Sequence, residues 1–134
     1  MLRQTQPRGP APQTLLLGVG ADPQQAARAR AEGADLIDVR GAAPKALAAI
    51  RASLPAGMLW TDPRADPLDA DQLAAATAAG QLTAAAVIAT AAVCTWLGAP
   101  VVRSRHTRAV RRAIDMTTSI AGHRPPSRTV RGLA

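Results

Sequence analysis

The sequence contains no phenylalanine and no tyrosine, and its only aromatic residues are Trp60 and Trp96. A hydrophobic core therefore has to be built from aliphatic side chains and from the many alanines. Because alanine buries little area per residue, we expect modest stability and a benefit from any partner surface. The scarcity of aromatic side chains also argues against a nucleic-acid partner, since nucleic-acid modules usually stack bases on aromatic rings.

Cysteine and lysine occur once each, as Cys94 and Lys45. A single cysteine excludes an internal disulfide and a cysteine metal cluster. Cys94 lies within an apolar run, so we expect a buried and inert thiol. The first thirteen residues, MLRQTQPRGPAPQ, lack the apolar stretch of a signal peptide, which favours a cytoplasmic location.

The formal net charge is +7, and the C-terminal stretch 101–134 carries eight arginines and two histidines against a single acid, Asp115. Such a charge suits nucleic acid or anionic lipid. However, an alanine- and arginine-rich composition is also typical of the codon usage of a GC-rich genome, so the charge alone does not imply a ligand.

No charged residue occurs from Gln72 to Val102, which raises the possibility of a membrane span. The run consists mostly of alanine and threonine, and Gly80, Gly98 and Pro100 interrupt it. We therefore expect a pair of alanine-rich core helices and no membrane span.

Short apolar runs alternate with helix signals along the chain, which predicts an α/β fold with about four parallel strands and flanking helices. The boundaries suggest a flexible lead over 1–13, a single domain over 14–121 and a basic tail over 122–134. Four strands are too few to close an eight-stranded barrel, so either the sheet is open or two chains complete each other. Strands are predicted at 14–20, 35–41, 57–63 and 100–104. The first helix is predicted to begin at Pro23, with Asp22 as its N-cap, and to end before Gly33. Further helices are predicted over 44–54, from the N-cap Asp69 to Gly80, over 82–97 and over 107–121, the last capped by Gly122.

The C-terminal stretch GAPVVRSRHTRAVRRAIDMTTSIAGHRPPSRTVRGLA resembles the end of actinobacterial dihydropteroate synthases and their paralogues. GQLTAAAVIATAAVCTWLGA is similar to the penultimate helix of this family, and AARARAEGADLIDVRG is similar to its EGAD-I-D-G-G region. LWTDPR resembles the strand whose aspartate binds the pterin. Because the family is a (β/α)8 barrel roughly twice this length, the resemblance implies a partial TIM-barrel-like domain that lacks the middle of the barrel.

The family's catalytic motifs are altered. Its N-x-T-P-D-S-F loop, which holds metal and diphosphate, is replaced by GVGADPQQ, and its G-G-E-S-T-R-P loop is replaced by RGAAPKA, in which Arg40 takes the place of the first glycine. The family's K-G-F lysine has no counterpart. The family's R-x-H motif aligns with Arg103, Ser104 and Arg105, so His106 comes one position late. We therefore expect no catalytic residue and no metal ligand, with Mg²⁺ needed only if the family activity is retained.

Arg103, Arg105 and His106 lie where a predicted strand ends and a helix begins, a place that favours anions. They are either a pocket for pterin diphosphate or a solvated rim. Asp62 has two interpretations as well, a carboxylate that binds the pterin or a turn residue in TDPRADP, and we prefer the turn. Asp35 and Asp38 fit an acid–base pair, but pairing with nearby arginines is the preferred interpretation.

The resemblance leads us to expect a shortened dihydropteroate-synthase-like pseudoenzyme. Its predicted helices 82–97 and 107–121 match the part of the family that forms the dimer interface, so we expect a homo-oligomer or a complex with a full-length relative, with residual pterin or phosphate binding. Two alternatives remain. One is an active dihydropteroate synthase, assembled as an oligomer, that joins p-aminobenzoate to a pterin diphosphate in folate biosynthesis. The other is a basic protein that binds nucleic acid or a membrane surface.

Overall fold

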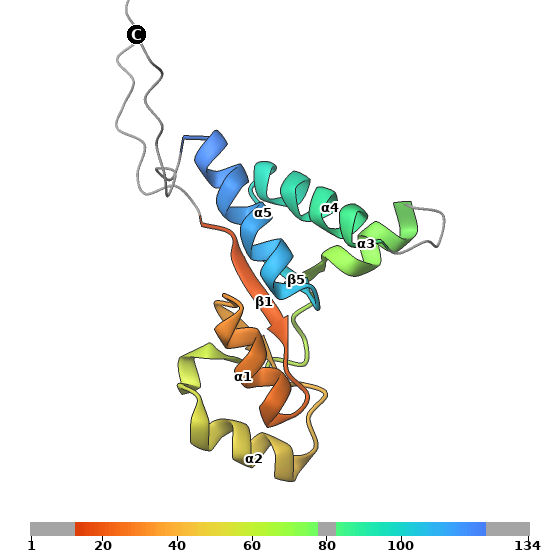
Figure 1. Ribbon diagram of the computed structural model, residues 1–134. Helices are drawn as coiled ribbons and strands as arrows, with labels where there is room; N and C mark the ends of the chain where they lie inside the picture. The colour runs from red at the N-terminus through yellow and green to blue at the C-terminus, as the bar shows by residue number, and fades with distance from the viewer. Residues whose placement is uncertain (1–12, 78–82, 123–134) are drawn as a thin grey trace, which may run out of the picture.

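Short apolar runs form the strands of a parallel sheet, and most of the stretches between them form helices that pack against it (Figure 1). The computed structural model describes residues 13–77 and 83–122. In chain order the elements are β1 (Leu15–Val19), α1 (Pro23–Ala31), β2 (Leu36–Asp38), α2 (Pro44–Ser53), the short 3₁₀ helix η1 (Ala56–Met58), β3 (Leu59–Trp60), β4 (Leu68–Asp69), α3 (Ala70–Thr77), α4 (Ala84–Trp96), β5 (Val101–Ser104) and α5 (Thr107–Ile120).

The strands lie in the order β3-β2-β1-β5-β4, and every neighbouring pair is parallel. This confirms the predicted α/β class with parallel strands and flanking helices, and the four predicted strands correspond to β1, β2, β3 and β5. The predicted number of strands is one too low, because β4 consists only of Leu68 and Asp69 and leads directly into α3. A two-residue strand has too few residues to show the alternating pattern by which strands are recognised.

The helices pack on one face of the sheet. Successive strand residues point to opposite faces, and the register places Leu16 beside Val102 and Gly18 beside Ile37. One core cluster joins Leu16 and Val102 to residues of α3, α4 and α5. A second cluster joins Ile37 to residues of α1 and α2. Both clusters thus use strand side chains from the same face.

The other face carries Leu17, Asp38 and Arg103, which alternate with the helix-facing residues. The connection 61–67 joins β3 at one edge of the sheet to β4 at the other edge without a helix. Arg40 holds this connection by donating a hydrogen bond from Nη1 to the carbonyl oxygen of Ala65, at 2.8 Å. The connection therefore runs close to the charged side chains of this face.

The helix ends follow the predicted signals. Asp22 caps α1 by accepting a hydrogen bond from the Gln25 amide at 2.8 Å, and proline occupies the first turn. Gly122 follows α5 with φ of +79°, the left-handed conformation that glycine adopts readily. The predicted helix end at Gly80, most of the lead 1–13 and most of the tail 122–134 lie outside the described residues.

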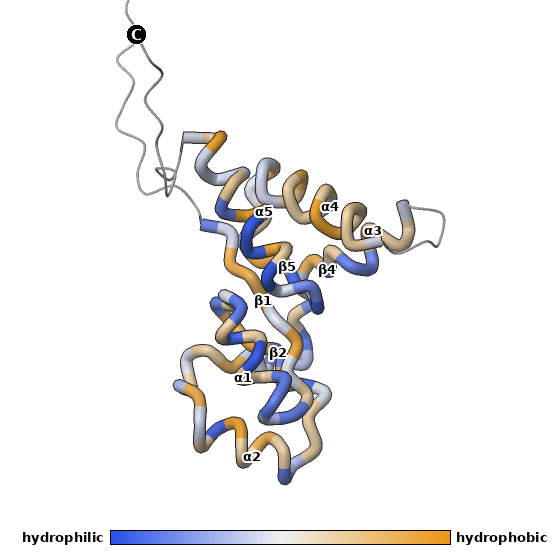
Figure 2. Tube along the Cα trace, in the orientation of Figure 1, coloured by the Kyte–Doolittle hydropathy of each residue, from blue (hydrophilic) through white to orange (hydrophobic). Residues whose placement is uncertain are grey.

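The uncharged stretch that follows Asp71 forms most of α3, all of α4 and the start of β5. This agrees with the expected pair of alanine-rich helices, and Figure 2 shows the apolar character of α4. Among the described helices, none has the length and hydropathy needed to cross a bilayer. Cys94 is buried in α4, as predicted, and this burial raises the pKa of its thiol.

Gly20 offers a test of the packing between β1 and its neighbours. A Cβ atom at this position would lie 2.6 Å from Cγ2 of Ile37 and 2.9 Å from Cα of Ala26. We expect Gly20→Ala to lower the free energy of unfolding by about 1–3 kcal/mol, as overpacked cores do. Gly41→Ala is the matched control, because a Cβ atom there meets nothing within 4 Å. Equal melting temperatures for the two variants would contradict the described packing.

Candidate functional site

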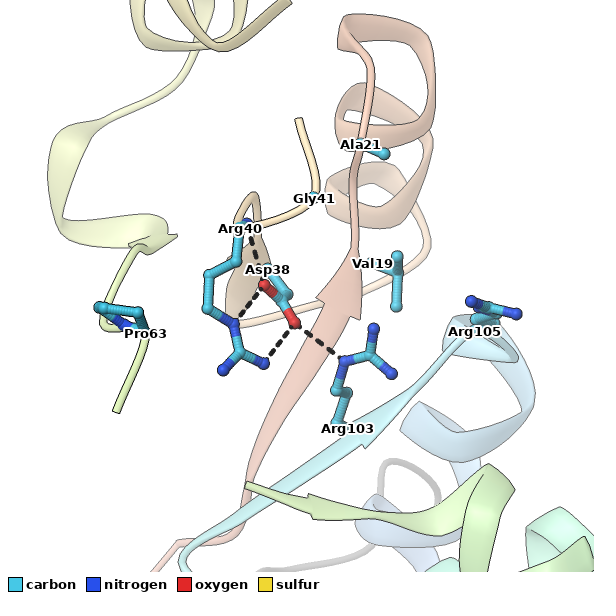
Figure 3. Close-up of a pocket in the computed structure, with 8 residues that line it drawn as sticks. All are labelled: Val19, Ala21, Asp38, Arg40, Gly41, Pro63, Arg103 and Arg105. Carbon is cyan, nitrogen blue, oxygen red and sulfur yellow. Dashed lines mark hydrogen bonds and ion pairs between the residues drawn. The ribbon is translucent and has the colours of Figure 1, made fainter. Parts of the chain in front are cut away.

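A cavity of about 500 Å³ opens at the carboxyl ends of β1, β2 and β5 (Figure 3). In open α/β sheets, ligands bind at this end of the strands. The lining combines backbone and small side chains with four charged residues, and its members are Val19, Ala21, Asp38, Arg40, Gly41, Pro63, Arg103 and Arg105. The position and the charge make this cavity the candidate site.

Asp38 is the central carboxylate of the cavity and is only 5% exposed. Arg40 donates to it three times, from the backbone amide at 3.1 Å, from Nε at 2.9 Å and from Nη2 at 2.8 Å. Arg103 adds a bond from its Nε at 2.9 Å. Burial alone raises the pKa of the Asp38 carboxyl, but the hydrogen bonds from the two arginines outweigh it and lower the pKa to about 2.

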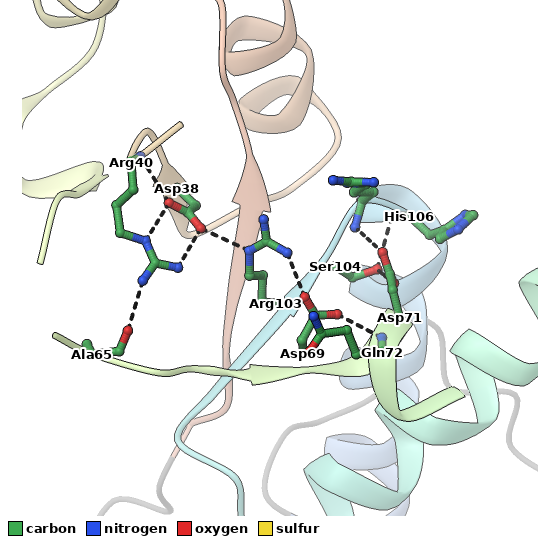
Figure 4. Close-up of polar contacts among 10 residues, drawn as sticks. Asp38, Arg40, Ala65, Asp69, Asp71, Gln72, Arg103, Ser104 and His106 are labelled. Carbon is green, nitrogen blue, oxygen red and sulfur yellow. Dashed lines mark hydrogen bonds and ion pairs between the residues drawn. The ribbon is translucent and has the colours of Figure 1, made fainter. Parts of the chain in front are cut away.

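Arg103 links strands on both sides of the cavity. Its Nε donates to Asp38, the last residue of β2, and its Nη1 donates to Oδ2 of Asp69 in β4 at 2.6 Å (Figure 4). The register explains the second contact, because Asp69 and Arg103 are direct neighbours across β4 and β5. Burial lowers the pKa of the Arg103 guanidinium, but the bonds to both carboxylates prevail and raise it. Arg103 is therefore fixed in position as a charged group.

Asp71 holds the turn between β5 and α5. It accepts hydrogen bonds from the Ser104 hydroxyl at 2.6 Å and from the Arg105 amide at 2.9 Å, and the Ser104 hydroxyl in turn accepts from the His106 amide at 3.0 Å. These contacts involve only the backbone of Arg105. Its guanidinium remains exposed at the edge of the cavity.

Two of the four predicted site residues, Arg103 and Arg105, line the cavity. His106 occupies the N-cap position of α5 and is not part of the lining. Asp62 also lies outside the lining, and its Oδ1 accepts a hydrogen bond from the Arg64 amide at 2.9 Å. This contact is the one that the turn interpretation of Asp62 requires.

Asp35 and Asp38 do not form an acid–base pair. Asp35, before β2, accepts from Arg111 Nη1 at 2.8 Å and from the Leu16 amide at 2.8 Å. Asp38, at the end of the same strand, binds Arg40 and Arg103. The preferred interpretation, in which each aspartate pairs with arginine, is confirmed.

The sequence did not reveal Arg40 and Asp69 as parts of this network. Arg40 stood out only because it replaces a family glycine, and Asp69 was recognised only as a helix cap. It does cap α3, since its Oδ1 accepts from the Gln72 amide at 3.0 Å, while its other oxygen binds Arg103. An acid just before a helix is a sequence signal for the capping role. The contact with Arg103 depends on the order of the strands in the sheet, which no local pattern contains.

Magnesium does not fit the charged end of the sheet. Within residues 13–77 and 83–122, no group of three or more histidine, cysteine, aspartate or glutamate residues is arranged to hold a metal ion. The carboxylates nearest the cavity, Asp38 and Asp69, are bound by arginine. A divalent cation would have to displace a guanidinium to reach them.

Acid is expected to weaken the fold through Asp38. Its carboxyl pKa is about 2 in the folded protein against an ordinary value of 3.8. The stabilisation is therefore complete above about pH 4 and is lost as the pH falls towards about 2, a difference of about 2 kcal/mol. Urea unfolding as a function of pH should show this loss, and Asp38→Asn should remove it. A variant that loses stability with acid as steeply as the wild type would contradict the role of Asp38.

Comparison with family models, with curated proteins and with solved structures found no match to this chain.

Proposed function

We propose that the chain is a shortened dihydropteroate-synthase-like domain that acts by associating with a second copy or with a full-length relative. In a closed (β/α)8 barrel, consecutive strands are neighbours and the last strand pairs with the first. The strand order supports an incomplete ring of this kind, because β4, β5, β1, β2 and β3 follow one another and β5 pairs with β1. The doubly wound strand order 3-2-1-4-5-6 instead places the strand after β3 beside β1.

The observation that carries association is an apolar surface on the ends of α4 and α5, here called the α4–α5 patch. Its five large side chains are between 58% and 78% exposed, and they are Val93, Trp96, Leu97, Met116 and Ile120. The patch includes a groove of about 290 Å³ to which both helices contribute. Trp96 is thus an exposed residue and not part of the core. Contiguous apolar surfaces of this kind mark interaction sites.

The distribution of charge favours a second copy of the chain, or another uncharged apolar surface, as the partner of the patch. The chain carries a net charge of +7, which by itself keeps molecules apart. The patch itself carries no charged side chain, because α4 contains no charged residue and Asp115 is the last charged residue of α5. The patch offers an acidic partner no cationic group to pair with, whereas a second copy can bury its own apolar patch against it.

Sedimentation of the full chain over a range of concentrations tests the association. We expect a reversible shift from monomer to dimer, because one self-complementary patch closes after two copies. Salt is expected to leave the dimer intact or to strengthen it, since salt screens the repulsion between two basic molecules. A monomer at all concentrations would contradict self-association.

Pairing with a full-length relative is distinguished by mixing. If the chain alone stays monomeric, we expect it to co-sediment with a full-length dihydropteroate-synthase-like protein through the same patch. A chain that neither dimerises nor enters such a complex would overturn the proposal as a whole.

Residual binding of a pterin diphosphate or phosphate at the cavity is the second part of the proposal. It is supported by the position of Arg103 and Arg105 at the carboxyl end of β5. The alternative, a dihydropteroate synthase that is active as an oligomer, predicts that the gene restores growth to a strain without its own enzyme. We expect no rescue, because the loops that hold metal and diphosphate in the family are replaced here by GVGADPQQ and RGAAPKA.

A further inference from the structure

A second cavity, of about 520 Å³, adjoins the first beside helix α1. The two share three residues of their lining, Val19, Ala21 and Arg105. The rest of the second cavity is formed by α1 and the residue after it, namely Gln25, Arg28, Ala29 and Glu32. The two cavities therefore meet over the end of β1, and Arg105 stands at the point where they join.

Carboxylates of the protein already bind the other arginines of both cavities. Arg40 and Arg103 are bound by Asp38, and Arg103 also by Asp69. In the second cavity, Nε of Arg28 pairs with Glu32 at 3.1 Å. These arginines are therefore matched by acids within hydrogen-bond distance, which leaves little of their charge for a ligand.

Arg105 differs from them. Among residues 13–77 and 83–122 its guanidinium has no ion pair and no hydrogen bond, since Asp71 accepts only from its backbone amide. That amide bond fixes the start of the side chain, and Arg105 is part of the lining of both cavities. Arg105 thus offers a full positive charge and a fork of donors to a ligand.

We propose that the two cavities form one groove for an elongated phosphate monoester, with its phosphate bound by Arg105. Nη2 of Arg103 supplies a further donor, because only its Nε and Nη1 are used by the two aspartates. The organic part of the ester lies along α1 or under the connection 61–67, where the lining is small or apolar, as at Ala21, Ala29 and Pro63. This inference deepens the proposed residual anion binding and rests on it.

The charge balance favours a monoester over a diphosphate. Arg28, Arg40 and Arg103 each pair with a carboxylate, which leaves Arg105 as the one lining arginine without an ion pair among the described residues. A phosphate monoester brings about −1.5 to −2 at neutral pH. A diphosphate adds more negative charge beside Asp38 and Asp69, and no further unmatched arginine lines the described groove to offset it.

Calorimetric titration of the full chain with three probes tests the inference, namely phenyl phosphate, inorganic phosphate and inorganic diphosphate. We expect phenyl phosphate to bind most tightly, because it alone combines one phosphate with an apolar group. Arg105→Gln should raise its dissociation constant about 10- to 100-fold, the loss expected for a charge-assisted hydrogen bond. Arg108→Gln is the control, since it removes the same charge one turn further along and lines neither cavity. The dissociation constant of phenyl phosphate for Arg108→Gln should differ from that for the wild type by less than about twofold.

The outcomes separate this inference from the proposal on which it rests. Diphosphate binding that is tighter than phenyl phosphate binding and insensitive to Arg105→Gln would overturn the inference and leave residual anion binding intact. Inorganic phosphate binding as tightly as phenyl phosphate would overturn the part that concerns the ester. The absence of heat with all three probes, on a protein shown to be folded, would overturn both the inference and the residual anion site, while dimerisation would still be judged by sedimentation.

Discussion

Replacing Arg103 by glutamine is expected to lower the free energy of unfolding by about 3 kcal/mol, the loss typical of removing one partner from a buried ion pair. Asp38 and Asp69 both bind this guanidinium and are 5% and 12% exposed. Without it the two carboxylates lie close together with only Arg40 to compensate Asp38. The variant should therefore unfold at lower urea concentration and melt at lower temperature.

Two further variants test whether the loss of stability in Arg103→Gln comes from its contacts with the two carboxylates. Arg105→Gln removes the same charge two residues away, and because its guanidinium is exposed we expect a loss below about 0.5 kcal/mol. Adding Asp69→Asn to Arg103→Gln should recover part of the lost stability, because asparagine removes the unpaired charge and still caps α3. If Arg103→Gln were as stable as Arg105→Gln, the contacts of Arg103 with Asp38 and Asp69 would contribute nothing to the free energy of unfolding.

Replacing Leu97 by aspartate is expected to abolish the proposed dimerisation. Leu97 is the most exposed large side chain of the α4–α5 patch, at 78%, so it contributes little to the folded monomer. A charge at this position would have to be buried without a partner in the dimer, and burying an unpaired charge typically costs several kcal/mol, or more than about 100-fold in affinity. We expect the variant to sediment as a folded monomer at concentrations where the wild type is dimeric.

Ala49→Asp is the matched control for this experiment. It introduces the same charge at an exposed position of α2, a helix that belongs to the other core cluster. We expect the control to dimerise like the wild type and both variants to melt close to it. Equal loss of dimer in the two variants would indicate a general effect of charge, and the patch would lose its special role.

Local signals in the sequence were sufficient for most of the fold. Asp22 followed by proline predicts the start of α1, and the apolar runs predict β1, β2, β3 and β5, because caps and strand patterns depend on near neighbours. The strand β4 was missed since its two residues lie between a proline-rich turn and a helix. Its place beside β5 follows from pairing across the sheet, which no local pattern contains.

The candidate site shows the same limit. Arg103 and Arg105 were predicted from their place at the end of a strand, and both line the cavity. The partners of Arg103 were not predicted, because Asp38 and Asp69 are 65 and 34 residues away along the chain. Arg103 is paired with two carboxylates and Arg105 is exposed, and this difference can be recognised only when the order of the strands is known.

Hydrogen–deuterium exchange of the full chain, recorded at concentrations above and below that of dimerisation, tests most directly whether the molecule acts through the α4–α5 patch. We expect amides around 93–97 and 116–120 to exchange more slowly in the concentrated sample, while those around 38–41 and 103–105 stay unchanged, because the cavity lies at the other end of the strands. Exchange that does not depend on concentration at the patch, or slowing confined to the cavity, would contradict association through these helices.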